Sequence, residues 1–171
     1  NDSMKKITII GSGLIGQGWA TVFAQAGFNV AMYDTSAQAT DVALNAMETR
    51  LSDMVAFNLI TSSDAPEILN RIYGARNLND AMDGAIYVQE CGPEDVDFKR
   101  EITTNLDAIA GSDVPIASST SGIAASRYCE DIAGRHRCLV VHPVNPPHLI
   151  PAVEIVPTPW TETKIVSQVK D

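Results

Sequence analysis

Residues 6–16 have the sequence KITIIGSGLIG, in which a β-branched run directly precedes three spaced glycines. The run before the glycines predicts a buried strand, and the small and apolar residues of Leu14–Ala26 predict the helix that follows. Gly11 permits a tight turn between the two, Gly13 lets a ligand approach the backbone, and Gly16 allows the helix to pack closely on the strand. This order of strand, glycine turn and helix predicts a pyrophosphate site at the helix N-terminus.

An acidic residue follows the second expected strand, Asn29–Tyr33, and this residue is Asp34. A carboxylate there can accept hydrogen bonds from both hydroxyls of an adenosine ribose, and it would repel a 2′-phosphate. Residues 35–37 (TSA) offer no arginine for such a phosphate. The sequence therefore predicts NAD rather than NADP, with the N–H groups of Leu14 and Ile15 facing the pyrophosphate. The alternative is a glycine turn with a purely structural role.

Strand-like and helix-like segments alternate along the rest of the chain, and Ile60–Pro66 interrupts them as a polar break. The further expected strands are Ile72–Ala75, Ala85–Gln89, Pro115–Ser118, Cys138–His142 and Val153–Val156. The further expected helices are Ala39–Val55, Leu78–Met82, Val96–Ile109, Ile123–Tyr128 and one that starts near Thr161. This alternation predicts an α/β fold of the Rossmann type, a doubly wound and mostly parallel sheet with helices on both faces. We expect residues 4–171 to form this domain and set residues 1–3 aside as an added leader.

The bulk composition fits one domain and excludes several classes of partner. The chain has 171 residues, 45% of them hydrophobic, which is enough for one sizeable core. Its net charge of -9 disfavours a nucleic-acid partner. The three cysteines form no C-x-x-C pair, so we expect reduced thiols in a cytoplasmic protein and no metal site. We also expect no membrane span and no signal peptide, because no apolar run is long enough.

Three later stretches carry a family resemblance: QECGPEDVDFKR (89–100), SSTSGI (118–123) and HPVNPPHLIPAVE (142–154). Together with GSGLIGQGWA at the start, they make the chain resemble the L-3-hydroxyacyl-CoA dehydrogenase family, and within it the λ-crystallin / L-gulonate 3-dehydrogenase branch. The resemblance covers the chain after Met4. It implies an NAD-dependent oxidoreductase that oxidises the 3-hydroxyl of an L-3-hydroxyacyl substrate, as in fatty acid metabolism.

The resemblance implies that His142 is the general base and that Glu154 orients it. The chemistry is consistent with this assignment, because a group must take the hydroxyl proton as hydride leaves carbon, and histidine titrates in the right range. A carboxylate on the other ring nitrogen fixes the tautomer and stabilises the imidazolium. The expected place of His142, at the carboxyl end of a strand, is where open α/β sheets bind ligands. The structural alternative is an ordinary histidine whose hydrogen bonds are satisfied at a strand end.

The resemblance gives roles to four more residues, each with a simpler alternative. Ser121 would contact the substrate oxygen and the nicotinamide, or it could cap a helix before Ile123. Asn145 would lie near the nicotinamide, or it could close the proline-rich turn. Glu94 and Lys99 would lie near the cofactor ribose and nicotinamide, or they could form a solvated charge pair.

The resemblance weakens on the helical arm that follows the second strand. Members that use coenzyme A thioesters carry lysines there, whereas residues 36–77 of this chain contain none. The same stretch carries five acids, Asp41, Glu48, Asp53, Asp64 and Glu67, and three arginines that could partly compensate, Arg50, Arg71 and Arg76. Such a surface attracts a polyanionic nucleotide weakly, which slightly favours a free 3-hydroxy acid such as L-gulonate over an acyl-CoA.

The resemblance also implies a second, all-helical domain for substrate binding and dimerisation beyond Asp171, and a homodimeric parent chain. We therefore expect the 171-residue chain to bind NAD and to turn over poorly by itself. The alternative function is that of a non-catalytic, crystallin-like structural or nucleotide-binding protein. A different Rossmann dehydrogenase would explain the glycines but would leave His142 and Glu154 without a role.

Overall fold

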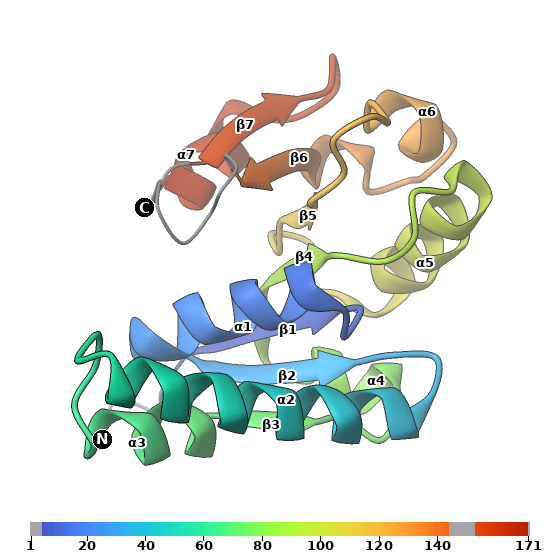
Figure 1. Ribbon diagram of the computed structural model, residues 1–171. Helices are drawn as coiled ribbons and strands as arrows, with labels where there is room; N and C mark the ends of the chain where they lie inside the picture. The colour runs from blue at the N-terminus through green and yellow to red at the C-terminus, as the bar shows by residue number, and fades with distance from the viewer. Residues whose placement is uncertain (1–4, 144–152, 171) are drawn as a thin grey trace.

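The computed structural model describes residues 5–143 and 153–170, which contain a single seven-stranded sheet (Figure 1). The strand order is β3-β2-β1-β4-β5-β6-β7. The strands are β1 Lys6–Ile10, β2 Asn29–Tyr33, β3 Ile72–Gly74, β4 Ala85–Glu90, β5 Ile116–Ser118, β6 Cys138–Pro143 and β7 Val153–Pro157. Strands β1 to β6 pair in parallel, and β7 pairs antiparallel with β6. The expected doubly wound, mostly parallel Rossmann sheet is therefore confirmed.

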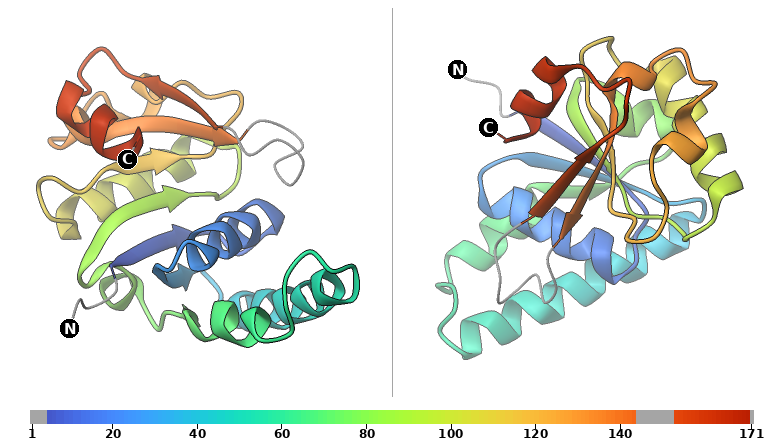
Figure 2. Two further views of the ribbon diagram at one scale, coloured as in Figure 1. Left: turned by 90° about the vertical axis from the view of Figure 1, so that its left-hand side faces the viewer. Right: turned by 90° about the horizontal axis from the view of Figure 1, so that it is seen from above.

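Helices cover both faces of the sheet, as Figure 2 shows. They are α1 Leu14–Gln25, α2 Ala37–Ala56, α3 Asp64–Asn70, α4 Leu78–Met82, α5 Val96–Ile109, α6 Ser126–Cys129 and α7 Thr163–Lys170, with a 3-10 turn η1 at Arg135–Arg137. Apolar residues of α1, α2, α3 and α7 pack on one face, and those of α4, α5 and α6 pack on the other. None of the helices in the described ranges is long and apolar enough to cross a membrane.

Two cores result from the alternation of side chains along the strands. On β1, Ile7 and Ile9 face the core under α1 and α2, whereas Ile10 faces the core under α5 and α6. Because both faces of a parallel sheet are buried, its strands consist of nearly continuous apolar residues. Since both faces are covered, polar side chains can gather only at the ends of the strands.

The structure differs from the sequence prediction in three segments. The expected polar break Ile60–Pro66 contains the start of α3, where Thr61 and Asp64 cap each other: each backbone N–H donates to the other side chain, at 3.3 and 3.2 Å. The residue types that cap a helix are the same polar types that are common in loops, and for this reason the sequence did not predict α3. Helix α6 begins at Ser126 rather than Ile123, and α2 begins at Ala37 rather than Ala39.

Candidate functional site

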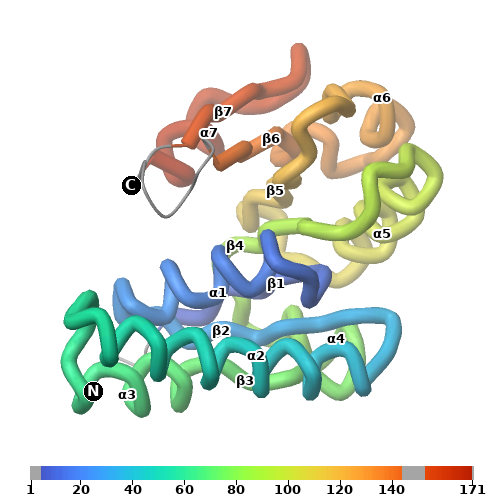
Figure 3. The backbone as a smooth tube through the Cα atoms, viewed as in Figure 1, coloured from blue at the N-terminus to red at the C-terminus, as the bar shows by residue number. Residues whose placement is uncertain are grey.

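The carboxyl ends of the parallel strands form the edge where the predicted site residues gather. At this edge the chain turns from β1 into α1 and from β2 into α2 on the same side of the molecule (Figure 3). Strand β1 has β2 on one side and β4 on the other, so successive connections leave in opposite directions at this point. Such a switch point is where open α/β sheets form a ligand crevice.

The glycine turn after β1 has the backbone that its sequence predicts. Gly11 has a φ of +98°, and its N–H donates to the carbonyl of Tyr33 at 2.8 Å. A Cβ at Gly11 would lie 2.7 Å from the carbonyl oxygen of Cys91, and one at Gly16 would overlap the carbonyl oxygen of Gly11. The first and third glycines are therefore required by close contacts within the protein.

The middle glycine faces open space instead. No atom lies within 4 Å of a Cβ built on Gly13, which is the N-cap of α1 and has no side chain that could accept from the first N–H groups of the helix. The first N–H groups of α1, those of Leu14 and Ile15, have no partner within the helix. An anion that approaches over Gly13 would meet these N–H groups and the positive end of the helix dipole. The turn therefore fits a pyrophosphate.

Substitution of Gly16 by alanine should weaken NAD binding by at least about tenfold, because the new Cβ would push the turn out of shape. The matched control is Gly18→Ala, two residues later on the same helix, where a Cβ meets no atom within 4 Å. Equilibrium binding of NAD to both variants measures the effect. Equal affinity of the two variants would show that the close contact of Gly16 with Gly11 is unimportant.

Asp34 lies directly after β2, beside the glycine turn. Its Oδ2 accepts hydrogen bonds from the N–H and the hydroxyl of Ser12 at 2.9 and 2.6 Å, and its Oδ1 accepts from the N–H of Thr35 at 2.7 Å. Partial burial acts to raise the pKa of Asp34, but the hydrogen bonds from Ser12 and Thr35 outweigh it and hold this pKa below its usual value. Asp34 is thus a carboxylate fixed next to the expected pyrophosphate site.

His142 and Glu154 stand directly opposite each other on the antiparallel pair β6 and β7. Side chains of opposed residues project from the same face of a sheet, with Cβ atoms about 5 Å apart. His142 is half-buried and Glu154 is exposed. Among the described residues, no hydrogen bond or ion pair joins the two side chains. The register nevertheless places a carboxylate within reach of the imidazole at the carboxyl end of β6.

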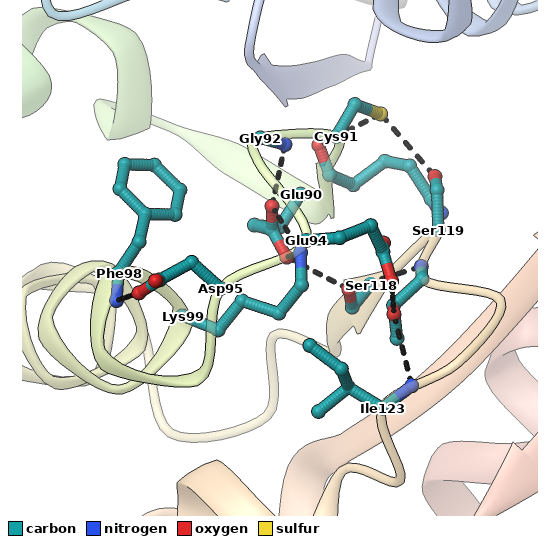
Figure 4. A network of polar contacts seen from close by, with 12 residues as sticks. Glu90, Cys91, Gly92, Glu94, Asp95, Phe98, Lys99, Ser118, Ser119 and Ile123 are labelled. Carbon is teal, nitrogen blue, oxygen red and sulfur yellow. Dashed lines mark hydrogen bonds and ion pairs between the residues drawn. The ribbon is translucent and has the colours of Figure 1, made fainter.

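A buried ion pair joins α5 to the carboxyl end of β4 (Figure 4). The Lys99 ammonium on α5 donates to both carboxylate oxygens of Glu90, at 2.7 and 3.1 Å, and these residues are 1% and 2% exposed. The same carboxylate accepts from the hydroxyl of Ser118 at 2.7 Å and from the N–H of Gly92 at 2.5 Å. Glu90 therefore ties α5, the end of β5 and the loop after β4 to one another.

This arrangement corrects one of the alternatives for Lys99. A solvated charge pair of Lys99 with Glu94 is wrong, because Lys99 is buried and its partner is Glu90. The ammonium of Lys99 is buried and donates to a carboxylate inside the protein, so we expect any influence on a cofactor to pass through the residues that Glu90 holds. Glu94 is exposed in the loop after β4.

A second set of hydrogen bonds shapes the loop that carries Ser121. The hydroxyl of Thr120 donates to the Glu94 carboxylate at 2.7 Å and accepts from the N–H of Ile123 at 3.2 Å. Thr120, and not Ser121, therefore bonds the N–H of Ile123, which corrects the expected alternative for Ser121. Ser121 itself is exposed, and its hydroxyl has no hydrogen bond among the described residues. Asn145 lies outside the described residues.

Sequence reasoning missed Glu90, Ser118 and Thr120 as parts of this site. The available signal was an ionisable residue at the end of the otherwise apolar strand AIYVQE, because buried charges are rare unless paired. Cys91, which follows Glu90, is not a candidate nucleophile, because burial raises the pKa of its thiol to about 12.

The fold and the site define a dinucleotide-binding domain, and comparison with known proteins gives its family. Residues 6–171 match the family described as 3-hydroxyacyl-CoA dehydrogenase, NAD binding domain. The chain belongs to this family, and its cofactor is accordingly NAD.

Three relatives illustrate the match. The lambda-crystallin homolog of Homo sapiens is 40% identical over 95% of this chain and 51% of its own length. The L-carnitine dehydrogenase/betainyl-CoA thioesterase of Agrobacterium fabrum is 37% identical over 88% of this chain and 30% of its own length. The crystal structure of (S)-3-hydroxybutyryl-CoA dehydrogenase from Ralstonia eutropha superposes with a TM-score of 0.91 and 28% identity, over 98% of this chain and 59% of that one. The chain thus spans about half the length of the lambda-crystallin relatives.

Proposed function

We propose that this chain is the cofactor-binding half of an NAD-dependent oxidoreductase that oxidises the 3-hydroxyl of an L-3-hydroxyacyl substrate. The observation that carries the proposal is the register of His142 opposite Glu154, at the same sheet edge as the glycine turn and Asp34. A histidine with a carboxylate neighbour at a dinucleotide-binding edge supports proton transfer next to a hydride acceptor.

His142 takes the proton of the substrate hydroxyl in this reaction, as the bond from hydrogen to the C3 carbon breaks. NAD, when bound, accepts that hydrogen as hydride. The carboxylate of Glu154 orients the imidazole and stabilises its charged form, which lowers the barrier to proton transfer. His142 is half-buried at the carboxyl end of β6.

The loop after β5 supplies the other contacts. Ser121 is exposed next to Thr120, which Glu94 holds, so its hydroxyl is free to bond the substrate oxygen or the nicotinamide. We assign Glu94 to the ribose on the nicotinamide side and Asn145 to the nicotinamide. Lys99 contributes by fixing Glu90 and the loops around it rather than by touching the cofactor.

A free 3-hydroxy acid is the favoured substrate over a coenzyme A thioester. The five acids of α2 and α3, which are Asp41, Glu48, Asp53, Asp64 and Glu67, are all exposed. The three arginines that could offset them donate to groups of the protein: Arg50 to Gln17, Arg71 to the carbonyl of Ala24, and Arg76 to Asp80. Because the five acids outnumber the three arginines, this arm carries a net negative charge and offers little attraction for a polyanionic nucleotide.

The substrate proposal is tested with a longer chain that includes the proposed second domain, and we propose that this longer chain is a homodimer. Its kcat/KM for L-gulonate oxidation with NAD should exceed that for reduction of acetoacetyl-CoA with NADH. The opposite order, from the same preparation, would assign the enzyme to acyl-CoA substrates. The 171-residue chain should show NAD binding and little turnover with either substrate.

A second candidate, a structural protein that binds NAD without catalysis, is favoured by the lambda-crystallin names of its relatives. Turnover that depends on His142 excludes it. Absence of turnover with any hydroxy acid, in a longer chain that still binds NAD, supports it.

A further inference from the structure

The carboxylate of Asp34 is fully used by groups of its own chain. Its Oδ2 accepts from the N–H and the hydroxyl of Ser12, at 2.9 and 2.6 Å. Its Oδ1 accepts from the N–H and the hydroxyl of Thr35, at 2.7 and 3.2 Å. An ionised carboxylate offers about four acceptor sites. A ribose that binds to Asp34 must therefore take the place of a donor that is already there.

The backbone donor of Ser12 is held in place. The carbonyl of Ser12 accepts from the Gln17 amide at 3.0 Å, and the other end of that amide accepts from Arg50 at 3.0 Å. Ser12 and Gln17 are each 7% exposed, so this part of the turn is packed. The hydroxyl of Ser12, in contrast, needs only a rotation of its own side chain to break its hydrogen bond with Asp34. The side chain, and not the backbone, is the group that can give way.

We propose that the hydroxyl of Ser12 competes with an adenosine ribose hydroxyl of NAD for Oδ2 of Asp34, and so lowers the affinity of the chain for its cofactor. The proposal rests on NAD binding at the glycine turn. The hydrogen bond from Ser12 is short and has a charged acceptor, which makes it stronger than a bond between neutral groups. The longer bond from the exposed Thr35 is weaker and is displaced more easily.

The proposal predicts that Ser12→Ala binds NAD about three- to tenfold more tightly than the wild type, because no bond within the protein has to be broken. Ser12→Thr, which restores the hydroxyl, should return the affinity close to the wild-type value. Thr35→Ala should give a gain of less than about twofold. Ser36→Ala is the matched control, because the Ser36 hydroxyl forms no cap on α2, and its affinity should be unchanged.

The sharpest test uses NAD analogues whose adenosine ribose lacks either the 2′- or the 3′-hydroxyl. With one of these analogues, Ser12→Ala and the wild type should bind equally, because the hydroxyl that competes with Ser12 is gone. A purely structural effect of the substitution would be the same for all three cofactors. Equilibrium calorimetry on the folded variants measures each affinity.

Three results overturn the proposal: unchanged NAD affinity in Ser12→Ala, weaker binding in that variant, or a gain that persists with both deoxy analogues. Weaker binding would make Ser12 a group that positions Asp34. If Ser12→Ala does not fold, Ser12→Cys, which is a weak donor, takes its place with the same expected direction. Failure of the wild type to bind NAD would instead contradict the proposed function, so the two failures are distinguishable.

Discussion

His142→Gln, made in a longer chain that carries the proposed second domain, should lower kcat by about a hundredfold to ten-thousandfold, with the affinity for NAD unchanged within about twofold. Glutamine keeps the polarity and much of the size of the side chain but cannot take the substrate proton at neutral pH. Because His142 lies at the end of β6, and β4 and β5 separate β6 from β1 with its glycine turn, the loss of the imidazole leaves the pyrophosphate site intact. Steady-state kinetics and calorimetry on the same preparation separate the two effects.

The matched control is His136→Gln in the 3-10 turn η1, where the ring contacts the carbonyl of Ser112 at 3.4 Å. This turn lies at the opposite end of β6, so the variant should keep the turnover of the wild type. A His142 variant that is as active as the His136 variant would remove His142 as the base. Glu154→Gln should lower kcat by a smaller factor, because it removes only the stabilisation of the imidazolium.

Lys99→Met should lower the free energy of unfolding by about 3–5 kcal/mol, because it leaves the carboxylate of Glu90 buried without its cation. Glu90 is 2% exposed and would keep only the neutral donors of Ser118 and Gly92. A loss of this size is a large part of the stability of a typical domain. Urea unfolding of the 171-residue chain measures it.

Two further variants show whether the unpaired charge is the cause. Glu90→Gln combined with Lys99→Met should recover much of the lost stability, since no buried charge remains. Lys164→Met breaks the exposed pair of Lys164 with Asp113 and should change the free energy of unfolding by less than about 1 kcal/mol. A Lys99 variant as stable as the Lys164 variant would show that the buried pair does not hold the loops together.

The parts of the site that could be predicted from sequence depend on local patterns. The roles of Gly11 and Gly16 follow from a turn that is completed within a few residues, and Asp34 follows from the end of the next strand. The pairing of His142 with Glu154 was expected from the family resemblance, and the β6–β7 register is the physical reason that the two lie close together. The two glycines and Asp34 need little knowledge of the rest of the fold, whereas His142 and Glu154 needed the resemblance.

The parts that could not be predicted depend on how distant elements dock. The partner of Lys99 is set by the packing of α5 against β4, and the sequence offered Glu94 as an equally good candidate. Likewise, Thr120 rather than Ser121 bonds Ile123, because the end of β5 turns the Thr120 side chain toward the loop after β4. In the run SSTS at residues 118–121, the sequence alone does not show which hydroxyl makes a given hydrogen bond, because that depends on the course of the backbone.

Titration of the 171-residue chain with NAD and with NADP by calorimetry tests the central claim most directly. We expect one molecule of NAD to bind per chain, and NADP to bind at least about tenfold more weakly, because Asp34 repels the 2′-phosphate. A folded sample that gives no heat with NAD, or that prefers NADP, would contradict the account.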